Sequence, residues 1–250
     1  MLVALTNVVS PKLVGQYGAV DYPLALRQHD EYCAALAERG VSVERLAVNA
    51  SYQNGCFVED TAVVVDELAV ITTMGAASRR GEPAAVGKHL AKYRETVHLS
   101  PPAALEGGDV LRVGKRLFVG LSSRTDARGL EELKRILSPF GYDVSGVSVR
   151  DGLHLKTACT ALDGETLLVN PEWVDTEPFK GFRLLAVPGD EATAANTLRV
   201  GDTIFLSACF PRTAEMVRER FARTEVLDIS EFRKAEAGLT CLSIIFEHAA

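Results

Sequence analysis

The sequence predicts an α/β fold in which five similar units close into a ring. Two segments carry the first observation: LRVGKRLFVGLSSRT (111–125) and LRVGDTIFLSACFPRT (198–213) both read as strand, two-residue turn, strand and a polar end, and a helical pattern follows each. Related patterns recur at a period of roughly 45–50 residues, which is typical of repeat architectures. Apolar strand patterns also occur at both ends of the chain, so pairing them would leave no free sheet edge.

The first two units are complete along the chain. FVEDTAVVVDELAVITTMGAASRRGE (57–82) predicts two strands, and a helix through Val86, Leu90 and Tyr93 follows. After 111–125, the segment DARGLEELKRILSPFG places apolar residues on one helical face, and Pro139 with Gly141 ends that helix.

The other three units follow the same plan. HLKTACTALDGETLLVN (154–170) predicts a hairpin that turns at Asp163-Gly164, and TAEMVRERFA predicts the helix after 198–213. The fifth unit combines TCLSIIFE with MLVALTNVV and the helix YPLALRQHDEYCAALAERG, which ends at Gly40. The alternative is an ordinary α+β domain whose hairpins resemble one another by chance.

Size and composition narrow the class of protein. With 250 residues the chain suits a single domain, 1–250, that can bury a core without a metal or a disulfide. A net charge of −6 with no basic run argues against nucleic acid and suits a small cationic substrate. Five scattered cysteines indicate neither a zinc site nor a disulfide framework, and we expect no metal. No apolar run is long enough for a membrane and the start resembles no signal peptide, so we expect a cytoplasmic protein.

Polar residues stand near the start of the opening strand in every unit. Burying such groups costs several kcal/mol unless they are paired, so equivalent placement in five units predicts one convergent site. In unit order these residues are Glu59 and Asp60, Glu106 and Asp109, His154, Asn196, and Cys241.

This set of side chains indicates chemistry on a cation. A thiol and an imidazole permit nucleophilic catalysis, and carboxylates beside a thiol need a cation to balance them. A guanidinium is planar, always charged and pairs with carboxylates through two hydrogen bonds. Arg79 and Arg124 follow the second strands of consecutive units and are placed to hold a substrate carboxylate. A single cysteine or histidine is usually a core residue, so their joint placement carries the hypothesis.

Six ordered motifs carry a family resemblance: FVEDTAVV, ASRRGE, LEGGDVL, FVGLSSRT, DGLHLKT and GLTCLS. Together they resemble dimethylarginine dimethylaminohydrolase, a member of the guanidine-modifying (amidinotransferase) superfamily, from about Arg27 to Phe246. The resemblance implies a fivefold α/β-propeller (pentein) of ββαβ units and no cofactor. It also implies hydrolysis of Nω-methylated arginine to citrulline and methylamine or dimethylamine.

The same resemblance implies roles for individual residues. Cys241 attacks the guanidinium carbon to form a thiouronium, His154 transfers protons, and Glu106 pairs with His154. For the substrate-binding groups, it implies that Asp60 and Glu59 hold the guanidinium, Arg79 and Arg124 the α-carboxylate, and the carbonyl of Ala235 the α-amine.

Three departures from the family pattern concern the substrate. Asn54 stands where the family has an aspartate that contributes to α-amine recognition, Thr73-Met74 replaces an Arg-Pro pair, and the lid segment KLVGQYGAVDY is short. An arginine deiminase, a hydrolase of another guanidino compound and an amidinotransferase therefore stay open, as does a protein that binds arginine derivatives without turnover. A homodimer is a further expectation.

Overall fold

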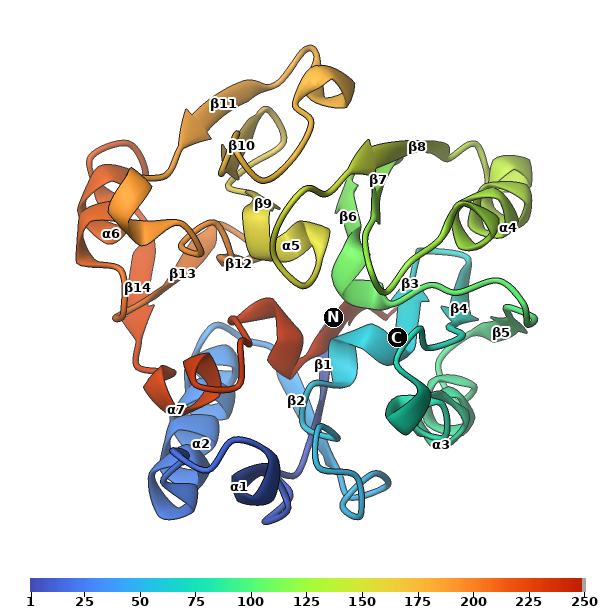
Figure 1. The fold of residues 1–250 in the computed structure, drawn as a ribbon, viewed down its shortest axis with the longest axis horizontal. Helices are drawn as coiled ribbons and strands as arrows, with labels where there is room; N and C mark the ends of the chain where they lie inside the picture. The colour runs from blue at the N-terminus through green and yellow to red at the C-terminus, as the bar shows by residue number, and fades with distance from the viewer. Residues whose placement is uncertain (249–250) are drawn as a thin grey trace.

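Five three-stranded sheets form the framework of the protein in the computed structural model, which describes residues 1–248. Figure 1 shows the sheets arranged around the middle of the molecule, with most of the helices toward the outside. The sheets, in chain order from the first complete unit, are β3 (Ala62–Val64), β4 (Leu68–Ile71) and β5 (Glu95–His98); β6 (Val110–Val113), β7 (Arg116–Leu121) and β8 (Asp143–Ser148); β9 (Cys159–Ala161), β10 (Thr166–Val169) and β11 (Arg183–Ala186); β12 (Leu198–Val200), β13 (Thr203–Ser207) and β14 (Thr224–Leu227); and β15 (Ile244–Glu247), β1 (Leu2–Asn7) and β2 (Ser42–Leu46).

All five sheets share one topology. The first two strands are antiparallel, and the third strand lies parallel to the second after a crossover. The helices of the structure are α1 (Leu13–Gln16), α2 (Tyr22–Glu38), α3 (Glu82–Leu90), α4 (Ala127–Leu137), α5 (Leu155–Ala158), α6 (Pro211–Arg218) and α7 (Ser230–Arg233). None of the helices within residues 1–248 combines the length and the apolar character that crossing a membrane requires.

The repeated LRVG motif forms a tight hairpin turn in both places. Val113 pairs with Arg116 and Val200 pairs with Thr203, so two residues connect the strands in each hairpin. Gly114 has φ +62° and Gly201 has φ +57°, a backbone region that favours glycine. The predicted hairpins are therefore present, and the segments at the two ends of the chain pair as expected, with Leu2 opposite Glu247.

Two helices end earlier in the structure than the sequence predicts. α3 ends at Leu90, so Tyr93 lies beyond it, and its hydroxyl donates to Glu44 at 2.6 Å instead. α6 ends at Arg218, so Phe221 also lies past the regular helix. In both cases apolar periodicity continues into the turn that leads to the third strand, where the side chains still pack against the core.

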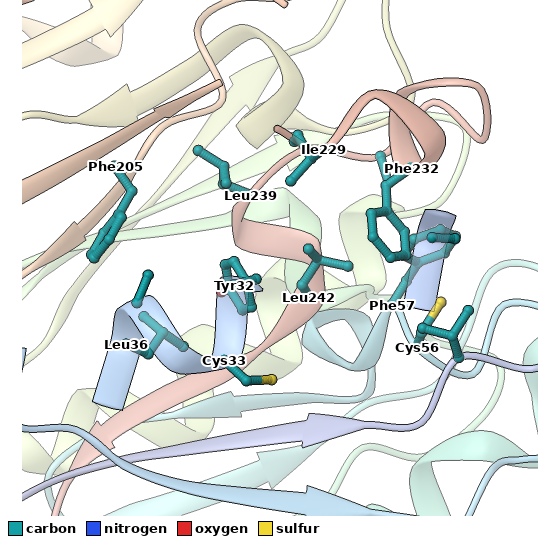
Figure 2. Packing of buried hydrophobic residues seen from close by; sticks show 14 of the residues in the cluster. Tyr32, Cys33, Leu36, Cys56, Phe57, Phe205, Ile229, Phe232, Leu239 and Leu242 are labelled. Carbon is teal, nitrogen blue, oxygen red and sulfur yellow. The ribbon is translucent and has the colours of Figure 1, made fainter. Parts of the chain in front are cut away.

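The longest helix supports the end of the chain that carries Cys241. α2 begins at the N-cap Asp21, whose side chain accepts from the Leu24 amide, and it ends before Gly40 at φ +78°. Its buried Tyr32 packs beside Leu242, as Figure 2 shows, and the Tyr32 hydroxyl lies 2.6 Å from Ser243 Oγ. The helix therefore fixes the segment immediately after Cys241.

Candidate active site

Short helical turns, rather than strands, carry the polar residue of four units. Each turn ends directly before the first strand of its sheet or, in the last unit, one residue before it. The turns are η1 (Val58–Thr61), η3 (Gly107–Asp109), α5 with His154 at its N-cap, and η7 (Thr240–Leu242). Glu106 and His154 are the N-caps of their turns, whereas Asp60 and Cys241 lie inside theirs.

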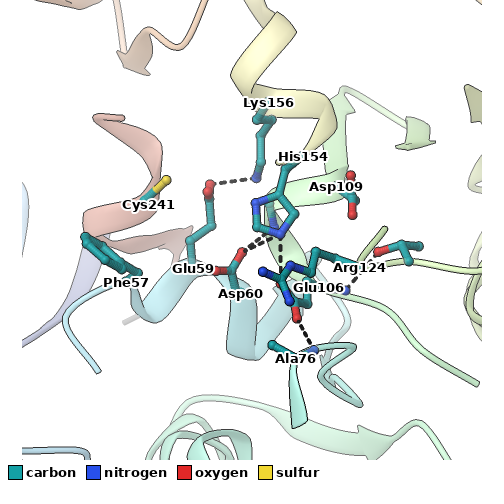
Figure 3. A network of polar contacts seen from close by, with 12 residues as sticks. Phe57, Glu59, Asp60, Ala76, Glu106, Asp109, Arg124, His154, Lys156 and Cys241 are labelled. Atoms are coloured by element: carbon teal, nitrogen blue, oxygen red, sulfur yellow. Dashed lines mark hydrogen bonds and ion pairs between the residues drawn. The ribbon is translucent and has the colours of Figure 1, made fainter. Parts of the chain in front are cut away.

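A cavity of about 110 Å³ lies among these turns. It is lined by most of the residues that the sequence placed in the site: Asn54, Asp60, Arg79, Glu106, Arg124, His154, Ala235 and Cys241. It is also lined by residues that sequence reasoning missed, among them Tyr17, Phe57, Ser78, Thr157 and Glu236. Figure 3 shows the polar network around His154 and Glu106, with Cys241 on a separate turn.

His154 is held between two buried carboxylates. Its Nε2 lies 2.8 Å from Glu106 Oε2 and 3.8 Å from Asp60 Oδ1. Burial alone would lower the pKa of His154, but the charge of Asp60 and the hydrogen bond to Glu106 outweigh it and raise the pKa to about 9. The imidazole is therefore protonated at neutral pH and can act as a general acid.

The backbone around His154 is shaped to hold the ring. Gly108 lies so close that a Cβ there would come within 2.7 Å of His154 Nδ1. Asp109 accepts from the Leu155 amide at 2.8 Å and from the Ser122 hydroxyl at 2.7 Å, so it anchors the first turn of α5. Burial raises the pKa of Asp109 in spite of the neighbouring His154.

Asp60 is kept ionised by two cationic neighbours. Burial opposes its charge, but His154 and Arg79 outweigh that effect and lower the pKa of Asp60. Arg79 Nη1 lies 2.5 Å from Asp60 Oδ2, and the Gly108 amide donates to Oδ1 at 2.9 Å. The carboxylate is thus a fixed negative charge on the wall of the cavity.

Arg79 is more engaged than a free carboxylate-binding cation would be. Nε donates to both oxygens of Glu82 at 3.0 and 3.1 Å, and Nη2 donates to Glu82 at 2.7 Å and to the Phe57 carbonyl at 2.8 Å. With the bond to Asp60, these contacts use four of the five N–H groups of the guanidinium. The guanidinium of Arg124, in contrast, donates no hydrogen bond to any residue whose side chain the structure describes, and Arg124 is only half-buried.

Cys241 presents its sulfur to the same cavity. The Gly238 amide donates to Sγ at 3.4 Å. Burial, with the charges of Glu59 and Asp60, raises the pKa of the Cys241 thiol to about 12. The resting thiol is therefore protonated at neutral pH, and it needs a cation nearby to become a thiolate.

The predicted binding residue Glu59 is placed differently from Asp60 in the structure. It does not line the cavity of Cys241, because its side chain points to a second cavity of about 520 Å³ beside the first strands. Oε1 accepts from Lys156 Nζ at 2.6 Å and Oε2 accepts from the Thr240 hydroxyl at 2.8 Å. Burial raises the pKa of Glu59 although Lys156 opposes this shift. Each oxygen of Glu59 thus already accepts one hydrogen bond, and its part in holding a guanidinium stays a prediction.

A wall one residue thick separates the two cavities. In four segments, neighbouring residues face opposite sides of this wall. The residue on the Cys241 side and its neighbour on the far side are Asp60 and Glu59, Glu106 and Gly107, Thr157 and Lys156, and Cys241 and Thr240.

Asn54, Ala235 and Glu236 contribute acceptor atoms to the cavity of Cys241. Asn54 Oδ1 is buried and has no hydrogen-bond partner within the described chain. Ala235 and Glu236 line the same cavity, and Glu236 has φ +59°, an unusual conformation for a residue with a side chain. The sequence signal for Glu236 was its place in the loop just before Cys241.

One group of donor atoms could also hold a metal ion. The ligand atoms of Asp60, Glu106 and His154 lie within 4.8 Å of one another. The protonated His154 and the guanidinium of Arg79 already supply positive charge to the two carboxylates. A planar cation that donates N–H groups matches these oxygens as well as a metal does.

The fold and the site define an enzyme class, a hydrolase that acts on guanidino C–N bonds. A family model described as "N,N dimethylarginine dimethylhydrolase, eukaryotic" matches residues 6–174. The chain belongs to the dimethylarginine dimethylaminohydrolase family, as the ordered motifs predicted.

Individual relatives cover most of the chain. It is 33% identical over 231 residues to N(G),N(G)-dimethylarginine dimethylaminohydrolase of Pseudomonas aeruginosa, covering 92% of this chain and 91% of the relative. The Streptomyces coelicolor protein of the same name is 37% identical over 226 residues, with 90% and 87% covered.

Solved structures agree with this assignment. A cysteine-to-serine mutant of the Pseudomonas aeruginosa enzyme, in complex with citrulline, superposes with a TM-score of 0.92 at 31% identity over 98% of both chains. The N-terminal domain of the arginine dihydrolase ArgZ from cyanobacteria has the same fold, with a TM-score of 0.85 at 18% identity over 98% of both chains.

Proposed function

We propose that this protein hydrolyses Nω-methylated arginine to citrulline and methylamine or dimethylamine through a covalent intermediate on Cys241. The observation that carries the proposal is the placement of a protonated imidazole, two buried carboxylates and a thiol on one cavity of about 110 Å³. Family membership and the relatives' names support the same reaction.

The first half of the reaction begins with substrate binding. The guanidinium pairs with Asp60 and Glu106, and its charge stabilises the thiolate, so the thiol proton leaves to solvent. Sγ then bonds to the guanidinium carbon. His154 donates its proton to the substituted nitrogen, the C–N bond breaks, and the amine departs from a thiouronium.

The second half uses His154 in the opposite sense. The neutral imidazole takes a proton from water, whose oxygen bonds to the thiouronium carbon. The C–S bond breaks and citrulline leaves. One proton remains on His154 and the other returns to the thiolate, which restores the resting enzyme.

The rest of the substrate is assigned to the far end of the cavity. Arg124 holds the α-carboxylate, because its guanidinium is uncommitted within the described chain. Arg79 mainly fixes Asp60 and offers one remaining N–H. Asn54 Oδ1, the Ala235 carbonyl and the Glu236 carboxylate surround the α-amine.

We also propose that the five separate sheets are the blades of one α/β-propeller domain, 1–250, with fivefold pseudosymmetry. The identical topology of the sheets and their arrangement around the middle in Figure 1 support this view. The homodimer and the cytoplasmic location stay predictions.

A product panel tests the function. Asymmetric dimethylarginine, monomethylarginine and arginine are each incubated with the protein, and citrulline, ornithine and the released amine are measured. We expect citrulline with methylamine or dimethylamine. Citrulline from arginine alone would indicate a deiminase, and ornithine formation with an amine acceptor would indicate an amidinotransferase.

A second experiment tests the role of His154. The variant His154→Gln should accumulate a thiouronium adduct on Cys241 that mass spectrometry detects. Full turnover in that variant would contradict the role of His154.

A further inference from the structure

Asn196 is a buried side chain that lines neither cavity and that the reaction does not use. It lies just before β12 and is 7% exposed. Its unit contributes no side chain to the walls around Cys241, although the sequence placed Asn196 at the position equivalent to His154 and Cys241. A buried amide is costly unless its polar atoms are paired, so its contacts indicate what it does.

The carboxamide of Asn196 connects the two turns that carry the reactive groups. Nδ2 donates to the Lys156 carbonyl in α5 at 2.9 Å, two residues after His154. The same nitrogen donates to the Thr240 hydroxyl at 3.1 Å, and the Thr240 amide donates to Oδ1 at 3.1 Å, one residue before Cys241. Both amide hydrogens and the carbonyl oxygen are thereby used.

These contacts also fix the direction of the Thr240 hydroxyl. Because this hydroxyl accepts from Asn196, its single hydrogen is directed to Glu59 Oε2 at 2.8 Å. Glu59 in turn binds Lys156, from the same turn whose carbonyl Asn196 holds. Asn196, Thr240, Glu59 and Lys156 therefore form a closed set of hydrogen bonds across η7 and α5.

Asn196 also packs against the residue that contacts the sulfur. A Cβ on Gly238 would come within 2.3 Å of the Asn196 carboxamide, so only glycine fits there without displacement. The Gly238 amide is the donor to Cys241 Sγ. The carboxamide thus constrains Cys241 from both ends of the loop.

We propose that Asn196 is a positioning residue that sets the location of Cys241 Sγ relative to His154, a role that rests on the proposed function. It touches neither substrate nor sulfur and acts through Thr240 and Gly238. Misplacement of reacting groups by about 1 Å can reduce a rate by roughly 100-fold. Loss of the hydrogen bonds that Asn196 makes to Lys156 and Thr240 should therefore slow the chemical step more than it weakens substrate binding.

The primary test compares Asn196→Asp with Asn170→Asp. The first change keeps the Oδ1 acceptor and the shape but removes both donors. Asn170 is a matched control: it is 5% exposed, Nδ2 donates to the Ala192 carbonyl at 2.9 Å, and it does not line the cavity of Cys241. We expect Asn196→Asp to lower kcat by about 10- to 100-fold with KM changed less than about threefold, whereas Asn170→Asp leaves both unchanged at temperatures where it is folded. Equal kcat losses in the two variants, or a loss carried by KM, would overturn the proposal.

A double-mutant cycle and a second variant cover the case in which Asn196→Asp fails to fold. Because Asn196 acts through Thr240, the kcat losses of Asn196→Ala and Thr240→Val should be less than additive in the double variant. Gly238→Ala pushes on the carboxamide from the other side and should reproduce the kcat loss. Additive losses, or a Gly238→Ala enzyme with unchanged kcat, would refute the role.

Alkylation of Cys241 by iodoacetamide separates this proposal from the hydrolase assignment. The reaction needs no substrate, so it reports the environment of Sγ even if the panel of guanidino compounds yields no product. Asn196→Asp should change the rate of alkylation and its pH dependence, and Asn170→Asp should change neither. An unchanged profile in Asn196→Asp would contradict the positioning role.

Discussion

His154 and Glu106 form a buried hydrogen-bonded ion pair, with Nε2 2.8 Å from Oε2 and both side chains at most 5% exposed. Glu106 also accepts from the Ala76 amide at 3.0 Å through its other oxygen, so the carboxylate cannot swing away without losing a second bond. Together with the charge of Asp60, this pair explains why the buried imidazole keeps its proton.

Replacing Glu106 by Gln should lower the pKa of His154 from about 9 toward its ordinary value. Because the folded-state pKa is raised above the ordinary histidine value of 6.5, the stabilisation from the charged imidazole is complete below pH 6.5 and is lost as the pH rises through about 9. The difference in melting temperature between wild type and Glu106→Gln should therefore be largest near pH 6 and shrink above pH 9. A difference that grows with pH would contradict the assignment.

Replacing Cys241 by Ser should abolish turnover, since a hydroxyl is a far weaker nucleophile than a thiolate. Activity within about tenfold of wild type would exclude the covalent mechanism.

In the wild type, alkylation of the Cys241 thiol should accelerate about tenfold per pH unit between pH 7 and 10, because the pKa of Cys241 is raised to about 12. A plateau below pH 9 would show that the thiolate forms without a bound cation.

Replacing Asn54 by Asp should strengthen the binding of substrates that carry an α-amine. The Oδ1 atom of Asn54 is buried without a partner in residues 1–248, so a carboxylate there adds charge where an ammonium is expected. We expect KM for methylated arginine to fall about threefold to tenfold. As a control, an analogue of methylated arginine that lacks the α-amine should bind no better to the variant than to wild type. An equal decrease in KM for both compounds would contradict the role of Asn54 in binding the amine.

Replacing Lys156 by Met should destabilise the protein, because it leaves the charge of Glu59 buried and without its cation. Breaking a buried ion pair from one side costs about 3–5 kcal/mol. The double variant Glu59→Gln, Lys156→Met should recover much of that loss in a denaturant titration. A double variant as unstable as the single variant would show that the pair contributes through packing and not through charge.

The sequence predicted the parts of the fold that depend on local signals. The two LRVG hairpins turn at Gly114 and Gly201, as a two-residue glycine turn requires. Helix ends were less accurate at Tyr93 and Phe221, because apolar periodicity alone does not mark where a helix stops.

The sequence indicated which residues gather at the site, but not which cavity each side chain faces. Asp60 and Glu59 are adjacent in sequence but line different cavities; alternation along a predicted strand indicates opposite sides, but not which of the two residues faces Cys241. Glu82 was missed as the partner of Arg79, although the spacing of three residues was a usable signal. Lys156 could have been found by asking which cation balances a second buried carboxylate.

The one-residue wall between the cavities has a consequence for how this chain can diverge. In the segments around Asp60, Glu106, Thr157 and Cys241, exchanging one side chain alters one face, but inserting or deleting a single residue would present the wrong neighbour to the reacting carbon. The number of residues in these turns is therefore constrained by both cavities at once, whereas the identity of each side chain is constrained by one cavity only.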